Sequence, residues 1–133
     1  MKNFYTLPIT VYTADTDVTG VVYHANYLKY FEQCRSSWLA HIKLPFSDLI
    51  KIGTIFAIKN ININYKIPLV LGQTVTCTAS IKQNKPCSIL FYQTIVDSTD
   101  NNIIYCNAEI LVASLDANFK PKKTHSILRG LTQ

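Results

Sequence analysis

The chain begins with a short alternation of apolar and more polar residues. Leu7, Ile9 and Val11 are separated by single residues, one of which is Pro8. A period of two is what a strand with one buried face requires. Proline has no N–H to donate to a neighbouring strand, so it indicates the start of a strand or an exposed edge. We therefore predict a first strand over residues 6–13.

A helical period follows a polar, turn-forming stretch at 15–20. Five apolar residues recur three or four positions apart: Tyr27, Phe31, Cys34, Trp38 and Ile42. This spacing places them on one face of a helix of about four turns. Asn26 is the predicted N-cap. Glu32 and Arg35 lie one turn apart and can pair, and Pro45 prevents the helix from continuing much further.

The rest of the chain indicates strands. After a short helical segment at 46–51, closed by Gly53, the apolar positions change parity between Ile58 and Ile61. A β-bulge at residues 59–60 would keep both sets of apolar side chains facing inward. Further strands are expected at 74–82, 87–96 and 104–112, separated by a turn at 85–86 and a polar connection at 97–102.

The order of these elements defines a fold class. Short connections between strands favour antiparallel pairing, and one long helix can cover one face of a sheet. The sequence therefore predicts an α+β domain with a five-stranded antiparallel sheet. A single helix leaves much of such a sheet and its edges uncovered, so we expect a second copy of the chain to bury the remainder.

Length and composition fit one domain with its own core, since the chain has 133 residues of which 48% are hydrophobic. Its apolar runs, such as 67–71, fall far short of the roughly 20 residues that cross a bilayer. The first ten residues lack the apolar segment of a secretory signal, and the cysteines form no Cys-x-x-Cys pair. We expect no membrane span, reduced thiols and a cytoplasmic location.

The net charge of +5 is concentrated near the C-terminus. The last 14 residues contain no acidic residue and four basic ones: Lys120, Lys122, Lys123 and Arg129. Residues 1–119 are left with nine basic and eight acidic residues. We predict one domain at 1–119 and a basic tail at 120–133. Nucleic-acid binding is not expected, because the folded part is nearly neutral.

Missing motifs exclude several enzyme classes. The four glycines cannot form a G-x-G-x-x-G or P-loop motif, and no G-x-S-x-G sequence occurs. His24, His41 and His125 are too scattered to form a typical metal site. We expect neither a cofactor nor a metal.

The densest group of polar residues is the run at 15–27. Asp15, Asp17 and Gly20 fall at positions 1, 3 and 6 of a calcium loop, but Asn26 stands where that loop needs a bidentate glutamate. Calcium binding is therefore not expected. In a purely structural interpretation the two aspartates organise a turn, Gly20 supplies a positive φ, and His24 helps to cap the helix.

A chemical interpretation of the same run stands beside the structural one. The carboxylate-bearing loop, an apolar Val-Val-Tyr segment and a helix N-terminus are forced together. Free N–H groups at a helix N-terminus can polarise a carbonyl, and a nearby carboxylate can take a proton from water or attack directly. These are the components needed for acyl hydrolysis.

The run at 15–27, followed by Phe31-Glu32 and Arg35, resembles the signature of the 4-hydroxybenzoyl-CoA thioesterase family of hotdog-fold proteins, and within it the Tol-Pal-associated acyl-CoA thioesterases. The run from Asn64 to Pro68, with Gly72 after it, is similar to the family's tyrosine-to-proline turn. The similarity extends over about residues 5–115.

The resemblance implies a hotdog fold, a homodimer with a continuous sheet that often pairs into a homotetramer, and active sites at the dimer interface. It implies that Asp17 is the catalytic carboxylate, as base or as nucleophile. The backbone N–H of His24 would face the thioester carbonyl, with its side chain assisting. The implied substrate-binding residues are Gly20, which shapes the loop, together with Val21, Tyr23, Tyr27 and Lys85.

Two departures from the aromatic thioesterases refine the expected substrate. These relatives have an aromatic residue and proline where this chain has His24-Ala25, so a fatty acyl thioester of CoA or of acyl carrier protein is expected instead. They also carry two basic residues at the turn after the third strand, where only Lys85 matches because Pro86 displaces the second. Lys85 either binds the CoA phosphate or is a solvated turn lysine.

Functions of other classes stay open at this point. One is a noncatalytic hotdog module that binds acyl-CoA, and another is a nucleic-acid-binding or partner-binding protein that acts through the basic tail. The intact Asp17 and His24 argue against the first, and the nearly neutral body of the chain argues against the second. A hotdog dehydratase is disfavoured, since its base is expected on a different element.

Overall fold

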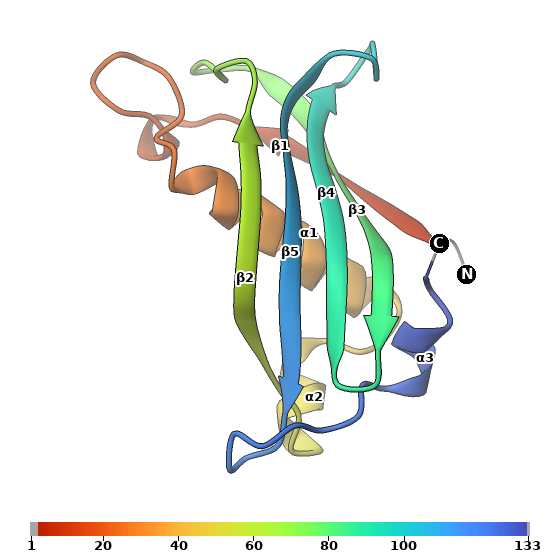
Figure 1. Cartoon of the computed structure of the whole chain (residues 1–133). Coiled ribbons are helices and arrows are strands. Elements are labelled where there is room, and N and C mark those ends of the chain that lie inside the picture. The colour runs from red at the N-terminus through yellow and green to blue at the C-terminus, as the bar shows by residue number, and fades with distance from the viewer. Residues whose placement is uncertain (1–2, 133) are drawn as a thin grey trace.

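The computed structural model describes residues 3–132, and these form one sheet with a long helix against it (Figure 1). The strands are β1 (Phe4–Thr10), β2 (Ile55–Tyr65), β3 (Thr74–Lys85), β4 (Ser88–Asp97) and β5 (Ile104–Leu115). The helices are α1 (Asn26–His41), α2 (Phe46–Lys51) and α3 (Ser126–Arg129), with a 3-10 turn η1 at Thr13–Asp15. All strand pairs in the described residues are antiparallel, in the order β1-β3-β4-β5-β2. The predicted fold class is confirmed.

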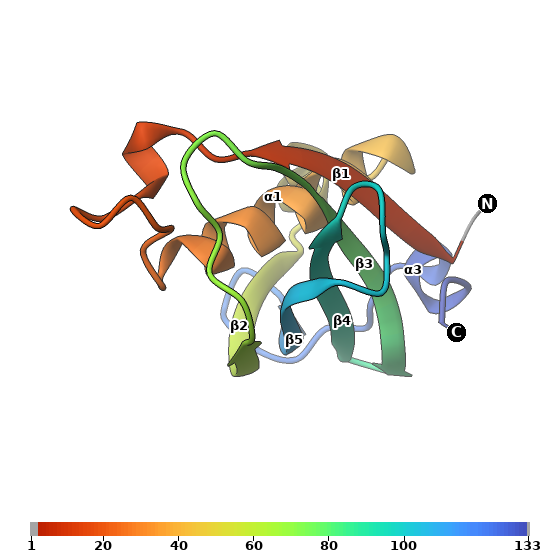
Figure 2. The same ribbon diagram turned by 90° about the horizontal axis from the view of Figure 1, so that it is seen from above.

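Strict alternation in β3 produces the buried face of the sheet. Val75, Cys77, Ala79 and Ile81 are all buried, whereas the threonines and serine between them are not. They pack with the apolar face of α1 in one core. The sheet curves so that β1 lies alongside α1, as the view from above shows (Figure 2).

The first strand differs from its prediction over 6–13. β1 covers Phe4–Thr10, and Pro8 lies in the middle of an edge strand, where its missing N–H costs nothing. Val11 is buried and continues the apolar alternation, but its N–H donates to the Gln73 carbonyl in a loop. Burial therefore continues beyond the end of the strand. Because the alternation of apolar residues follows burial, it predicts a strand that ends later than the observed one.

The bulge predicted in β2 is confirmed, because the register with β5 shifts between Ile58 and Asn60. Both sets of apolar side chains face inward as predicted, since Ile58 and Ile61 lie opposite the buried Val112 and Ile110 of β5, but several of them stay exposed at the uncovered edge. Ile58, Ile61 and Tyr65 are 49%, 37% and 49% exposed. β2 is the other edge of the sheet in the described residues, and α1 packs mainly on β1 and β3 at the opposite side.

Two expectations about α1 are also corrected. Ala25 rather than Asn26 occupies the N-cap position, and Asn26 uses its Nδ2 to donate to the Asp15 carbonyl at 2.8 Å. Glu32 and Arg35 form no ion pair within 4 Å in the described chain. Arg35 is buried in the core instead, while the Glu32 carboxylate accepts a bond from Ser36.

Residues 120–132, which the charge pattern sets apart as a tail, pack against the sheet. The N–H of Lys122 donates to the Ser114 carbonyl, and that of Thr124 donates to the Pro86 carbonyl. Leu128 and Leu131 are buried in the core. In residues 3–132, no helix has the length and apolar character that crossing a membrane requires.

Candidate active site

The loop that carries Asp17 is a tight turn closed by its own backbone. The Asp17 N–H donates to the Val21 carbonyl at 2.9 Å, and the Gly20 N–H donates to the Asp17 carbonyl at 3.1 Å. Gly20 has a φ of 82°, which explains why the turn needs a glycine. This loop and the segment after β2 lie side by side beyond the start of α1 (Figures 1 and 2).

The Asp17 carboxylate is exposed and held on one side only. Its Oδ1 accepts bonds from the Thr19 hydroxyl at 2.6 Å and the Thr19 N–H at 2.8 Å. These bonds favour the ionised form and lower the pKa of Asp17 below its ordinary value. The Val21 N–H also lowers the pKa of Asp17, but among the described residues none forms a hydrogen bond to Oδ2 within 3.5 Å, so this oxygen can face water or substrate.

Asp15 lies two residues earlier in quite different surroundings. Its buried carboxylate pairs with Lys29 and accepts the Tyr12 N–H at 3.1 Å. Its carbonyl accepts the Tyr23 N–H at 3.0 Å and the Asn26 side chain. Burial raises the pKa of Asp15, but the hydrogen bonds outweigh burial and the pKa lies below its ordinary value. Asp15 thus joins the loop to the start of α1.

His24 directly precedes the N-cap of α1 and is fixed from both sides. Its carbonyl accepts a bond from the Tyr65 hydroxyl at 3.0 Å, and its ring lies against the Tyr23 ring with 4.3 Å between centroids. Within residues 3–132, nothing accepts a hydrogen bond from the His24 N–H. A free N–H at the positive end of a helix dipole is available to a ligand's carbonyl oxygen.

The segment after β2 holds this assembly in place. The Val22 N–H donates to the Leu69 carbonyl at 2.9 Å, and the Leu69 N–H donates to the Tyr27 hydroxyl at 3.2 Å. The Leu71 N–H donates to the Gly20 carbonyl at 3.0 Å. Loop, helix and connection are therefore positioned by one set of backbone bonds.

These segments surround an open pocket of about 390 Å³. Its lining consists of Asp17, Val21, Val22, His24, Tyr27, Tyr65, Lys66, Ile67 and Pro68. Four of the residues singled out in the sequence meet here: Asp17, Val21, His24 and Tyr27. A carboxylate and a free N–H on one pocket can activate water and polarise a carbonyl together.

Other sequence-based site residues lie elsewhere, and some lining residues were missed. Gly20 and Tyr23 flank the pocket without lining it. Lys85 pairs with Ser88 in the β3–β4 hairpin, at the opposite end of the sheet from Tyr65. Tyr65 was not chosen as a site residue, although the run from Asn64 to Pro68 was the signal that could have identified it.

A five-stranded antiparallel sheet with one long helix against it is the hotdog fold, found also in solved thioesterases. The probable thioesterase from Bartonella henselae superimposes with a TM-score of 0.84 at 26% identity, covering 92% of this chain and 99% of that one. The site at the helix N-terminus carries groups that suit thioester hydrolysis.

The chain belongs to the thioesterase superfamily, whose family model matches residues 19–104. It is 31% identical over 116 residues to the acyl-CoA thioester hydrolase YbgC of Escherichia coli, covering 86% of this chain and 85% of that protein. It is 30% identical over 117 residues to the acyl-CoA thioesterase YbgC of Haemophilus influenzae, covering 87% and 84%. The chain is a thioester hydrolase, and the resemblance stated from its motifs is confirmed.

Proposed function

We propose that this chain hydrolyses fatty acyl-CoA thioesters, with Asp17 as the catalytic carboxylate and the His24 N–H as the group that polarises the thioester carbonyl. The observation that carries the proposal is that Asp17 and His24 line one pocket at the start of α1. The names of the two YbgC relatives support CoA as the carrier.

The His24 N–H is the electrophilic group in this mechanism. The thioester carbonyl oxygen accepts a bond from this N–H, and negative charge grows on that oxygen as the carbonyl carbon is attacked. A preorganised donor stabilises this charge more than it stabilises the neutral substrate, so it lowers the barrier. The Tyr65 hydroxyl helps to hold the backbone of His24 in place by donating to its carbonyl, in the peptide unit that follows the N–H.

Asp17 supplies the negative charge that drives the attack. As a base, its free Oδ2 takes a proton from water while the water oxygen bonds to the carbonyl carbon. The C–S bond then breaks, and the CoA thiolate takes up the proton. As a nucleophile, Oδ2 displaces the thiolate itself and leaves a mixed anhydride for water to cleave. The lowered pKa keeps Asp17 ionised at neutral pH, as both routes require.

The walls of the pocket support an acyl group without polar substituents. Val21, Val22, Ile67 and Pro68 present apolar surface beside the two reacting groups. An alkyl chain released from water against such walls stabilises the bound substrate.

The exposed apolar residues of β2 support a homodimer. Two copies of this edge strand, paired about a two-fold axis, would continue the sheet and cover Ile58 and Ile61. Antiparallel pairing would lay the Tyr65 end of one β2 beside the Ile55 end of the other. The pocket with Asp17 would then lie near the partner's β3–β4 hairpin.

The cysteines support a cytoplasmic site of action. Among the described residues Cys34, Cys77 and Cys106 are buried, and no cysteine forms a disulfide. Reduced thiols are typical of proteins in a reducing compartment.

The test is a hydrolysis series from acetyl-CoA to palmitoyl-CoA, in which the released thiol is titrated. We expect turnover to rise with chain length to a maximum within the series. Under the same conditions, the aromatic thioester 4-hydroxybenzoyl-CoA should be hydrolysed more slowly than the best fatty acyl substrate. Absence of turnover with every acyl-CoA would reject the proposal, and preference for the aromatic substrate would reject its fatty acyl part.

A further inference from the structure

Arg35 is a buried cation with few partners. Its residue is 7% exposed, and one of its nitrogens, Nη1, donates to the Gln93 side chain at 2.8 Å. Gln93 is itself buried, and its side chain is oriented by a second hydrogen bond, which its Nε2 donates to the Phe31 carbonyl at 3.0 Å. A guanidinium carries five N–H donors and stays charged at all ordinary pH values. Burial lowers the pKa of Arg35, as expected for a charge removed from water.

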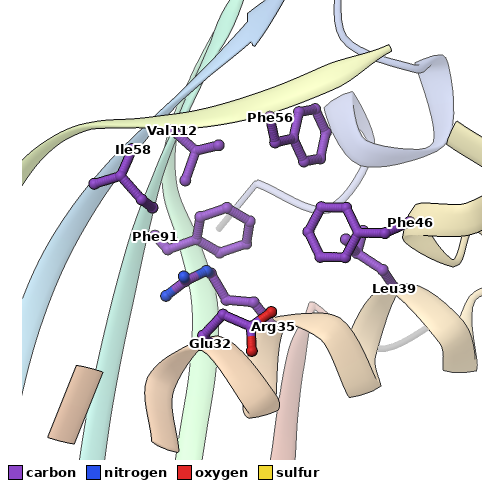
Figure 3. A pocket seen from close by; sticks show the side chains of 8 residues that line it. All are labelled: Glu32, Arg35, Leu39, Phe46, Phe56, Ile58, Phe91 and Val112. Atoms are coloured by element: carbon purple, nitrogen blue, oxygen red, sulfur yellow. The ribbon is translucent and has the colours of Figure 1, made fainter. Parts of the chain in front are cut away.

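No carboxylate neutralises this cation in the described chain, where the ion pairs are Lys29–Asp15 and Lys82–Glu109. Glu32 is one turn away, but its carboxylate accepts the Ser36 hydroxyl at 2.5 Å. In Figure 3 the guanidinium lies below the Phe91 ring, and the Glu32 carboxylate is turned the other way. A buried charge without a partner is costly, so the free donors of Arg35 favour an anionic acceptor.

Arg35 faces a pocket of about 160 Å³ that is separate from the one with Asp17 (Figure 3). Glu32 also lines this pocket, and its other walls are apolar: Leu39, Phe46, Phe56, Ile58, Phe91 and Val112. Phe46 and Phe56 meet edge to face at 5.8 Å, and the Arg35 guanidinium lies 5.9 Å from the Phe91 ring centre. An apolar cavity of about 150 Å³ is large enough for benzene, so the space fits about six carbon atoms.

We propose that this pocket binds a carboxylate attached to an apolar body of about six carbons. The planar carboxylate accepts two N–H groups of Arg35, a geometry that a guanidinium fork matches, and the apolar body lies among the phenylalanines. Such a ligand has two sources, a free fatty acid or the far carboxylate of a dicarboxylic acyl thioester. The second source rests on the proposed function, and the first does not.

The distance along α1 matches the length of a medium-chain acyl group, which the second source requires. Arg35 is eight residues after Tyr27, which lines the pocket with Asp17, and eight residues of helix span about 12 Å. An extended carbon chain advances about 1.25 Å per atom, so about ten carbons cover this distance. Sebacyl-CoA is a thioester of this length with a far carboxylate, and decanoyl-CoA is its match without one.

Calorimetric titration of the intact protein with hexanoate, and with neutral hexanamide as the matched ligand, tests the site without any need for turnover. We expect hexanoate to bind at least tenfold more tightly than hexanamide. Arg35→Met should remove this preference. Glu32→Gln removes only a nearby negative charge, so it should tighten hexanoate binding severalfold. Equal binding of acid and amide by the wild type would overturn the proposal.

A second variant keeps the test decisive if Arg35→Met does not fold. Ile58 is half-exposed at the rim, so Ile58→Trp fills the pocket while Arg35 stays in place. We expect hexanoate binding to fall at least tenfold in this variant. Unchanged binding in folded Ile58→Trp would place the ligand elsewhere and overturn the proposal.

Hydrolysis assays then separate the two sources. If the far carboxylate of the substrate occupies the pocket, Arg35→Met lowers kcat/KM for sebacyl-CoA and spares decanoyl-CoA. If a free acid is the ligand, both substrates respond alike and hexanoate binding is still lost in the variant. Either result supports the pocket. An inactive wild-type protein would reject the proposed function and leave the calorimetric result standing.

Discussion

Asp15 and Asp17 are two residues apart, and the fold gives them opposite surroundings. Asp15 is buried and pairs with Lys29, whereas Asp17 is exposed and keeps one oxygen free. We therefore expect the two carboxylates of one loop to have separable roles, the first in stability and the second in chemistry.

Asp15→Asn should lower the free energy of unfolding by about 1–2 kcal/mol, because it removes charge-assisted hydrogen bonds to a buried group. The folded-state pKa of Asp15 lies below its unfolded value. Its contribution is therefore present above pH about 4 and is lost as the pH falls through the lower folded pKa. Urea unfolding at a series of pH values should show a smaller acid loss in Asp15→Asn than in the wild type. If the free energy of unfolding falls with pH equally in the wild type and in Asp15→Asn, Asp15 does not have this stabilising role.

His24→Ala separates the contributions of the side chain and the backbone. The N–H remains in the alanine variant, and such donors are worth about 2.7–4 kcal/mol to the transition state. We expect kcat to fall without being abolished. A His24→Ala variant as inactive as Asp17→Asn would show that the imidazole is the essential group. A role in capping alone predicts a lower Tm with normal kinetics.

At the residue scale, the candidate residues that the structure brings together come from one contiguous run, and their roles stay predictions. Asp17, Val21, His24 and Tyr27 lie within one run, and they meet in one pocket. Tyr65 comes from a strand 41 residues after His24, to which it bonds, and no local pattern records that contact. The unpaired Arg35 was likewise hidden, because helical spacing alone made Glu32 its expected partner.

At the scale of elements, periodicity located the strands and helices, but contacts between elements determined their ends. Asn26 has the side chain of an N-cap, yet the Asp15 carbonyl attracts its Nδ2, and the cap moves to Ala25. β1 ends at Thr10 although burial continues to Val11. Such ends depend on tertiary hydrogen bonds, which local propensity does not describe.

The free edge of β2 carries a prediction about assembly. The wild type should have at least the mass of a dimer in solution, because β2 leaves Ile58 and Ile61 exposed in the single chain. Ile61→Lys places a charge at this edge and should shift the protein toward the monomer with loss of turnover. Analytical ultracentrifugation measures both masses. A fully active wild-type monomer at assay concentration would remove the basis for a shared site.

At the scale of the whole molecule, composition was the least reliable guide to the C-terminal segment. Its lysines and Arg129 indicated a tail, but Leu128 and Leu131 enter the core. Net charge alone does not indicate which apolar side chains of a basic segment are buried. Fold class was predictable because alternation and helical period extend over whole elements.

Lys85 can bind the CoA phosphate only if two copies assemble, so its test belongs to the whole molecule. β3 lies three strand spacings from β2, about 14 Å, and its Lys85 end would face the other chain's pocket. Lys85→Ala should raise KM for acyl-CoA severalfold, leave kcat unchanged, and lose its effect in high salt or with a thioester that lacks the nucleotide. An unchanged KM at low ionic strength would leave Lys85 as a solvated turn lysine.

Steady-state hydrolysis by Asp17→Asn is the test of Asp17 as the catalytic carboxylate. The substrate is the fatty acyl-CoA that the wild type hydrolyses best, and Asp15→Asn is the matched control in the same loop. We expect kcat to fall by about 10²–10⁴ in Asp17→Asn with an unchanged Tm, and by much less in folded Asp15→Asn. Turnover within a fewfold of wild type in folded Asp17→Asn would contradict the account.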